Sequence, residues 1–290
     1  MYRAKEPGAE RLQVFSSELG ERRRAERERR RDLERALERG EFELRFQPQV
    51  ALRDNAVVAT EVLLRWRHPT RGWIAPRDFI PAAEASGLIR PIGRWVLQES
   101  CARAAAWLEA GLPFGRVAVN LSPVQLARPQ IVTEVREALA ATKLPAQRLE
   151  LELTEGVLVA DPAACAAVMH DLAALGLRLT LDDFGKGHSS LAYLRRFPLS
   201  RLKIDRAFVA EVAVDADAAA IARAIIALGR ELRMCVVGEG VETEAQRRWL
   251  VEHGCDAIQG HVVAPPMAEA TWRAKLERLR DDARGAFAAG

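Results

Sequence analysis

The sequence has few cysteines, no long apolar run and almost no net charge. Its four cysteines, among 290 residues, show no CxxC or CxxH spacing, which argues against a zinc site and favours reduced, buried thiols. No uninterrupted apolar stretch approaches the roughly 18 residues that a membrane span needs, and no signal-peptide pattern opens the chain. We therefore expect this chain to be cytoplasmic.

The charge balance and the absence of nucleotide-loop motifs narrow the function further. The 43 basic and 40 acidic residues leave a formal net charge of +3, which gives no signal for a nucleic-acid polymer or a membrane surface. Neither GxGxxG nor GxxxxGK[ST] follows an apolar run, which argues against a dinucleotide-binding fold and against a P-loop nucleotide-binding protein. The hydrophobic content of 49% is enough for one large core or two modest ones.

The first 40 residues differ in composition from the rest. Residues 21–41 are almost wholly Arg, Glu, Leu and Ala, and the Glu and Arg residues recur three and four apart, which supports an exposed helix. Leu33 and Leu37 make too thin an apolar stripe for a coiled coil. A basic nucleic-acid arm is the alternative, but interleaved glutamates cancel most of its field. We interpret residues 20–40 as a charged, solvated, helical linker.

From Phe42 onward, short apolar runs alternate with segments of helical periodicity. The predicted strands are Phe42–Gln47, Ala56–Trp66, Val117–Asn120, Arg148–Leu153, Leu177–Leu181, Arg201–Ile204, Met234–Val237 and Ala257–Gln259. The predicted helices are Phe79–Ala85, Ile92–Ala110, Ile131–Ala141, Pro162–Leu175, Ala216–Leu232, Glu244–His253 and Ala268–Asp282. Roughly eight strands alternating with helices over about 240 residues favour a closed α/β barrel over an open sheet.

Polar side chains lie within or just after the predicted strands, at Glu61, Asn120, Glu152, Glu155, Asp182, Asp183, Lys203, Asp205, Glu239, Glu242 and Gln259. In a βα barrel the carboxyl ends of the strands converge on one face, where active sites lie. We therefore expect a bowl of carboxylates that cannot all stay ionised without a positive charge among them.

Oxygen ligands from Asp, Glu and Asn suit hard cations such as Mg²⁺ or Mn²⁺. The adjacent aspartates Asp182 and Asp183 can serve two ions, and two metals about 3.5–4 Å apart are the arrangement that cleaves phosphodiesters. Lys203 would supply a fixed cation near the nucleophilic water.

Each of these residues also has a plainer interpretation. A pair of aspartates after a strand is often a helix N-cap, a lone Glu at a strand end is usually solvated, and a single Lys usually lies on the surface. These interpretations do not explain the whole set, because each would apply to one residue separately. They would leave it to chance that several carboxylates lie at the same end of the predicted barrel.

Residues 42–266 resemble the EAL domain of bacterial cyclic di-GMP phosphodiesterases nearly from end to end. The motifs that carry the resemblance are Phe46-Gln-Pro48, Glu61-Val-Leu-Leu-Arg-Trp66 with His68-Pro69, Phe79-Ile-Pro81, Asn120-Leu-Ser122, Glu152-Leu-Thr-Glu155, Asp182-Asp-Phe-Gly185, Leu202-Lys-Ile-Asp205, Gly238-Glu-Gly-Val-Glu-Thr243 and Gln259-Gly260. Any one of them is weak, but the ordered set is specific.

The resemblance implies a TIM-like (β/α)8 barrel with one antiparallel strand, two Mg²⁺ or Mn²⁺ ions and hydrolysis of cyclic di-GMP to linear pGpG. The metal ligands that it implies are Glu61, Asn120, Glu152, Asp182, Asp183 and Glu239. The other catalytic positions are Lys203, Glu155, which would brace the loop after Asp183, and Glu242. The substrate contacts are Gln47, Leu63, Arg65, Asp205 and Gln259. The alternative is a catalytically weak EAL domain that acts as a cyclic di-GMP receptor.

The resemblance also predicts partners. It implies a homodimer through the barrel-loop face. Residues 1–19 resemble the end of a GGDEF domain, so we expect a GGDEF remnant (1–19), the linker (20–40) and the EAL barrel (41–284). An upstream GGDEF domain would then precede this chain, and the full-length protein could be attached to a membrane upstream.

The sequence departs from the usual family pattern at five positions, none of them a predicted metal ligand. These are Val62, Lys186, His188, Gly238 and His261. Lys186 and His188 put in doubt the behaviour of the loop after Asp183 and the dimer contacts, and His261 puts in doubt how a guanine base would stack.

Overall fold

The computed structural model describes residues 24, 27–156, 162–185 and 194–288, with side chains as far as residue 281. It divides into two compact units, which are described separately below. The first unit contains Met1–Glu43 and Arg65–Ile89, and the second contains Leu44–Leu64 and Arg90–Gly290. The predicted GGDEF remnant (1–19), Lys186 and His188 lie outside the described residues.

The second unit is built on a closed barrel. Its strands are β1 (Phe42–Ala51), β2 (Val57–His68), β4 (Val117–Leu121), β5 (Leu149–Thr154), β6 (Arg178–Phe184), β7 (Arg201–Ile204), β8 (Cys235–Gly238) and β9 (Ala257–Ile258). The first two residues of β1 and the last four of β2 belong to the first unit. The order is β1-β9-β8-β7-β6-β5-β4-β2, and pairing of β1 with β2 closes the ring. β1 runs antiparallel to β9, whereas the pairs from β2 through β9 are parallel. The predicted TIM-like barrel with one antiparallel strand is therefore confirmed.

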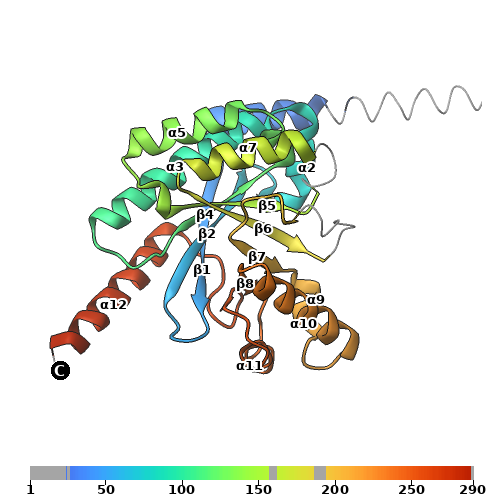
Figure 1. Cartoon of the computed structure of the whole chain (residues 1–290). Coiled ribbons are helices and arrows are strands. Elements are labelled where there is room, and N and C mark those ends of the chain that lie inside the picture. The colour runs from blue at the N-terminus through green and yellow to red at the C-terminus, as the bar shows by residue number, and fades with distance from the viewer. Residues whose placement is uncertain (1–23, 25–26, 157–161, 186–193, 289–290) are drawn as a thin grey trace, which may run out of the picture. The chain divides into compact units, whose positions relative to one another are not determined.

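Helices follow the strands of this unit. They are α3 (Ile89–Glu109), α4 (Pro123–Leu126), α5 (Gln130–Thr142), α7 (Pro162–Ala174), α9 (Arg206–Glu211), α10 (Ala216–Glu231), α11 (Glu244–Glu252) and α12 (Glu269–Ala288), with a short 3-10 helix η1 at Ala146–Arg148. Figure 1 shows α5 and α7 side by side, and α9 beside α10. In α10 the apolar residues Ala222, Ile225 and Ile226 are buried, and the Asp215 side chain caps the first turn.

Within the described ranges, no helix combines the length and the apolar composition that crossing a bilayer requires.

The first unit holds a helix over residues 27–38, β3 (Gly72–Ile74) and α2 (Pro76–Ser86). β3 pairs antiparallel with the end of β2. Phe42, Trp66 and Phe79 form a buried aromatic group with ring centroids 5.6–5.9 Å apart.

The helix over residues 27–38 is less solvated than its composition suggests. Leu33 and Ala36 are 1% and 0% exposed, and Asp32 accepts a hydrogen bond from Arg71 at 2.7 Å. The apolar stripe is thin, but it is buried in this unit. The charged side chains of this helix are exposed or half-buried, as expected of a solvated helix, whereas Leu33 and Ala36 are buried.

Candidate metal centre

A buried lysine lies at the centre of the polar barrel interior. Lys203, on β7, is 0% exposed. Its Nζ atom lies 3.4 Å from Glu61, 2.9 Å from Glu152, 3.4 Å from Asp182 and 2.6 Å from Glu239. We call these five residues the Lys203 cluster. They come from four strands, β2, β5, β6 and β7, and from the residue that follows β8, so the predicted convergence of strand ends is present.

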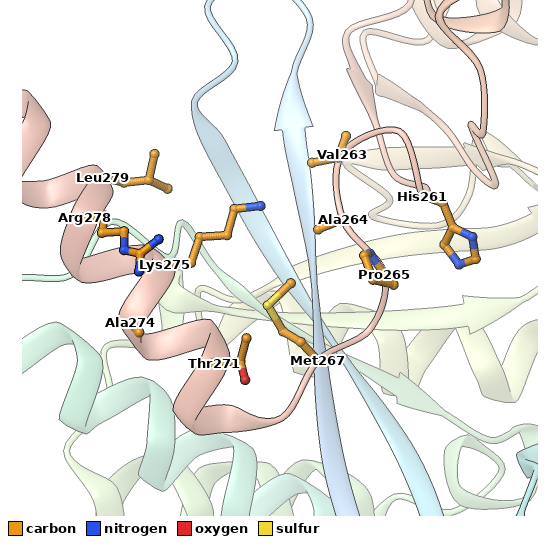
Figure 2. Close-up of a pocket in the computed structure, with 10 residues that line it drawn as sticks. All are labelled: His261, Val263, Ala264, Pro265, Met267, Thr271, Ala274, Lys275, Arg278 and Leu279. Carbon is orange, nitrogen blue, oxygen red and sulfur yellow. The ribbon is translucent and has the colours of Figure 1, made fainter.

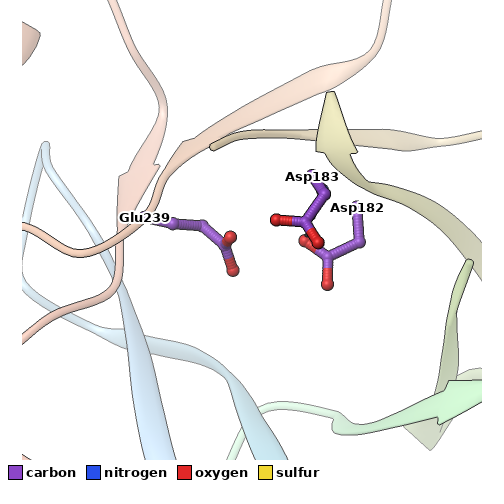
Figure 3. Close-up of side chains that lie close together, drawn as sticks. All are labelled: Asp182, Asp183 and Glu239. Carbon is purple, nitrogen blue, oxygen red and sulfur yellow. Dashed lines mark hydrogen bonds between the residues drawn. The ribbon is translucent and has the colours of Figure 1, made fainter. Parts of the chain in front are cut away.

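The backbone of β6 departs from regular geometry where it carries its aspartates. The register between β6 and β7 shifts between Leu181 and Phe184, which is the mark of a bulge that re-aims side chains. Asp183 has a φ of 55°, a left-handed conformation that few residues other than glycine adopt, and its N–H donates to Asp182 Oδ1 at 2.8 Å. As Figure 3 shows, the carboxylates of Asp182, Asp183 and Glu239 face one another.

Gly185 completes this irregular stretch. Its φ is 105°, and a side chain there would place a Cβ atom 2.7 Å from the ring of Phe208. Its N–H donates to Glu155 Oε2 at 3.2 Å. The predicted brace between Glu155 and the loop after Asp183 therefore has a described contact at the start of that loop.

Two amide side chains donate hydrogen bonds to Glu61. Asn120 Nδ2 donates to Glu61 Oε1 at 2.8 Å, and Gln259 Nε2 donates to Glu61 Oε2 at 2.6 Å. Gln259 Nε2 also donates to Gln47 Oε1 at 2.9 Å. Gln259 Oε1 is buried and has no hydrogen-bond partner among the described residues, which leaves an acceptor beside the Lys203 cluster.

The three glutamates of the Lys203 cluster have pKa values that are shifted in different directions. Burial, and then repulsion from Glu61, raise the pKa of Glu152 well above its usual value although Lys203 opposes this. Burial also raises the pKa of Glu239 well above its usual value, against the attraction of Lys203. Burial alone would raise the pKa of Glu61 too, but Lys203 and the amide donors outweigh it and the pKa is lowered.

The charge of the site is unbalanced. Burial alone would lower the pKa of Lys203, but its carboxylate neighbours, Asp182 first, raise it well above the usual value, so Lys203 is a fixed cation. With Asp183, five carboxylates face one ammonium, a formal charge of −4 when all are ionised. Ligand oxygens of Asp182, Asp183 and Glu239 lie within 4.8 Å of one another. All of these donors are oxygens, so the residues fit hard divalent cations.

The structure does not bring every predicted residue to this cluster. Asp205 is buried, and its Oδ1 accepts from Ala207 N at 2.8 Å as the N-cap of α9. Glu242 is exposed, and its described hydrogen bond is a backbone one, in which its N–H donates to Gln246 Oε1. Leu63 is half-buried, and Arg65 belongs to the first unit. The roles expected for these four residues stay predictions.

A second buried ion pair lies among residues that the sequence analysis did not single out. Arg201 is 2% exposed, and its Nη1 atom donates to Glu150 Oε1 and Oε2 at 3.0 and 3.1 Å. Gln49 Oε1 accepts from the same atom at 3.0 Å, and Thr180 Oγ1 donates to Glu150 Oε1 at 2.6 Å. We call these four residues the Arg201 cluster.

The two-residue alternation of side chains along a strand could have revealed the Arg201 cluster in the sequence. Glu150, Thr180 and Arg201 each precede a residue of the Lys203 cluster by two positions, and alternate residues of a strand point to the same side. The inward-facing partners of the predicted site could have been found in this way.

A separate hollow of about 710 Å³ lies between α12 and the segment after β9. Lys275 and Arg278 reach it from α12, and Met267 lies between the helix and the loop, with His261 at the far side (Figure 2). None of the predicted site residues lines this hollow. His261, one of the five positions at which the sequence departs from the family pattern, does line it.

Comparison with known proteins places the chain in a family. The EAL domain family matches residues 30–266. The chain is 43% identical over 92% of its length to the bifunctional diguanylate cyclase/cyclic di-GMP phosphodiesterase MucR of Pseudomonas aeruginosa, of which it spans 39%. It is 40% identical over 98% of its length to the cyclic di-GMP phosphodiesterase NbdA of the same organism, of which it spans 36%.

A solved structure, described as the PaMucR phosphodiesterase in complex with c-di-GMP, has a TM-score of 0.81 and 44% identity, and the match covers 84% of this chain and 99% of that one. The chain thus spans less than half the length of these two curated relatives but matches nearly the whole chain of the solved structure. The match to the family covers most of the described barrel and every residue of the Lys203 cluster, and the chain belongs to the EAL domain family.

Proposed function

We propose that this chain is a cyclic di-GMP phosphodiesterase that hydrolyses cyclic di-GMP to linear pGpG. Two lines support the proposal. Both curated relatives described above carry cyclic di-GMP phosphodiesterase in their names, and the similar solved structure is described as a complex with c-di-GMP. All of the carboxylates that the reaction is expected to need are present, with the lysine among them.

The observation that carries the proposal is the excess of carboxylates around Lys203. We infer that two Mg²⁺ or Mn²⁺ ions balance it, held by Glu61, Asn120, Glu152, Asp182, Asp183 and Glu239. Divalent cations at such a site lower the pKa of bound water and stabilise the charge that develops on a phosphodiester. The raised pKa values of Glu152 and Glu239 fit this assignment, since those carboxylates lack enough positive charge when Lys203 is their only cation.

We infer that Lys203 acts on the reacting phosphate. In the reaction, water adds to phosphorus, one P–O ester bond breaks, and the departing ribose oxygen takes up a proton. The Lys203 ammonium is held by four carboxylates and has no freedom to move away, so it stabilises negative charge without reorganisation. Gln259 donates to Glu61 and to Gln47, and we infer that both amides orient the substrate, together with Leu63, Arg65 and Asp205.

The remaining partners belong to the same proposal. We infer a homodimer through the barrel-loop face, with Glu155 and Gly185 linking that loop to the metal ligands. MucR carries a diguanylate cyclase activity in its name, which supports a GGDEF domain upstream of this chain in the whole protein. A receptor that binds cyclic di-GMP without cleaving it is not favoured, because no metal carboxylate is missing and Lys203 is in place.

A direct assay tests the proposal. The chain is incubated with cyclic di-GMP and Mg²⁺ or Mn²⁺, and the products are separated by chromatography. We expect pGpG to accumulate, to stop when a chelator is added and to resume when the ion is restored. Ca²⁺ should occupy the site and support little turnover, because it prefers more ligands at longer distances. Binding of cyclic di-GMP with no product at any metal concentration would favour the receptor, and full activity in chelator would overturn the two-metal site.

A further inference from the structure

Gln49, on β1, is the one member of the Arg201 cluster that the described hydrogen bonds also join to the Lys203 cluster. Its Oε1 accepts from Arg201 Nη1 at 3.0 Å, and its Nε2 donates to Glu152 Oε1 at 3.1 Å. It is 0% exposed, so no solvent competes for either bond. We propose that Gln49 is a positioning residue that fixes the carboxylate of Glu152 for metal binding; this inference rests on the proposed function.

The orientation of the Gln49 amide is determined by its neighbours. A guanidinium can only donate hydrogen bonds, so the atom that faces Arg201 must be the amide oxygen. The amide nitrogen then faces Glu152, and it can only donate. An amide that flipped would place two donors together at Arg201 and two acceptors together at Glu152, which is unfavourable at both ends.

Arg201 is itself fixed. Two hydrogen bonds join its Nη1 atom to the carboxylate of Glu150, which also accepts from Thr180. Breaking a buried pair of this kind is strongly unfavourable, so the arginine does not turn away from Gln49. The Arg201 cluster therefore gives Gln49 a rigid support.

Glu152 is held through both of its oxygens. Gln49 donates to Oε1, and Lys203 Nζ donates to Oε2 at 2.9 Å. Glu152 is 1% exposed, and no other described side chain donates to Oε1. Without Gln49 the carboxylate would keep one anchor and could rotate about it, and partners of metal ligands typically change metal affinity by about 10–100-fold.

Affinity for Mn²⁺ tests the inference in the absence of substrate. Free Mn²⁺ is measured by electron paramagnetic resonance during titration of the metal-stripped chain, for wild type, Gln49→Met and Thr180→Val. Gln49→Met keeps the volume and removes both hydrogen bonds. Thr180→Val is the matched control, because it removes a hydrogen bond inside the Arg201 cluster and none to Glu152. A melting curve for each variant reports whether it is folded.

We expect Gln49→Met to bind Mn²⁺ about tenfold or more weakly and Thr180→Val to bind as wild type does. In turnover assays the loss in Gln49→Met should be recovered by excess Mn²⁺, with KM for cyclic di-GMP unchanged. If Gln49→Met does not fold, Gln49→Asn serves instead, because the shorter amide cannot reach both partners and should weaken Mn²⁺ binding in the same way.

Two results would overturn the inference alone: equal Mn²⁺ affinity in wild type and the Gln49 variants, or an equal loss in Thr180→Val. The first would make Gln49 a filler of polar core space, and the second would make the effect a general loosening of the Arg201 cluster. A wild-type chain that binds no Mn²⁺ would overturn the proposed metal site and this inference with it.

Discussion

The Arg201 cluster and the Lys203 cluster share three strands, β5, β6 and β7, on which their residues lie two positions apart, yet their charge balance differs. In the first, the Arg201 guanidinium pairs with the Glu150 carboxylate, and Gln49, Thr180 and the Cys235 side chain interact with this pair. In the second, one ammonium meets four carboxylates, with the carboxylate of Asp183 close by. A balanced buried pair is complete without a ligand, whereas an unbalanced one needs further positive charge.

This difference separates residues that hold the barrel together from residues that do chemistry. Burial alone would lower the pKa of Arg201, but its interactions with Glu150 and Cys235 together outweigh burial and raise that pKa. The pKa values of Glu152 and Glu239 are raised instead, which means that their ionised forms are not fully compensated. Uncompensated charge in a buried cluster is a mark of a functional site.

The largest effect is expected from breaking the balanced pair. Arg201→Met leaves Glu150 buried and unpaired, and the free energy of unfolding should fall by about 3–5 kcal/mol. Chemical denaturation measures it. The double variant Arg201→Met/Glu150→Gln removes both charges and should recover part of the loss. If the double variant is no more stable than the single one, charge imbalance is not the cause.

Removal of the cation from the unbalanced cluster should damage chemistry more than substrate binding. Lys203→Ala is expected to lower kcat by roughly 10²–10³, as loss of one preorganised charge-stabilising donor does. KM for cyclic di-GMP should change little, because the interaction strengthens only as charge develops. Lys275→Ala, at a lysine outside the cluster, is the control. Weaker binding with unchanged kcat would make Lys203 a contact to the bound phosphate only.

Glu155 tests how the second aspartate is held. Glu155→Ala removes the acceptor for Gly185 N, so kcat and apparent metal affinity should fall together by about 10–100-fold, although Glu155 itself is not a proposed ligand. Turnover measured against metal concentration reports both quantities. Glu155→Gln keeps an acceptor of the same length and should be milder. If turnover of Glu155→Ala matches that of wild type at every metal concentration, the proposed role of Glu155 as a brace is wrong.

A smaller effect is expected on stability as pH changes. The raised pKa values of Glu152 and Glu239 mean that the metal-free folded chain retains protons that the unfolded chain has lost, so stability should decline as pH rises from about 4.5 through the raised values. The lowered pKa of Glu61 acts below that window, where its contribution is lost as pH falls. Melting temperatures in chelator across this pH range measure the decline, and bound Mn²⁺ should reduce it. A rise in metal-free stability over the same window would contradict the assignment.

The strand order and most of the Lys203 cluster could be predicted from the sequence, because strand ends in a βα barrel share one face. The elements missed were short ones: β3, α4, α9 and η1 have three to six residues, too few to show a period. β1 extends to Ala51, beyond the predicted end at Gln47, because its inward residues Gln47 and Gln49 are polar and break the apolar pattern.

Contacts between distant residues could not be predicted in the same way. Leu33 and Ala36 are buried by packing in the first unit, and composition alone does not reveal a packing partner. The bond from Gln49 to Glu152 joins residues 103 positions apart and depends on the register of β1 in the closed barrel. The left-handed backbone of Asp183 follows from the bulge in β6, and an aspartate pair after a strand gives no sign of it.

The central claim is that the Lys203 cluster, with its excess negative charge, binds metal ions and that the balanced Arg201 cluster does not. The number of Mn²⁺ ions bound by the metal-stripped chain tests this claim most directly. Titration calorimetry would compare wild type, Asp182→Asn/Asp183→Asn and Thr180→Val. We predict two ions per wild-type chain with release of protons, the same in Thr180→Val, and loss of binding in the double aspartate variant. Absence of binding in wild type, or binding that survives Asp182→Asn/Asp183→Asn unchanged, would contradict it.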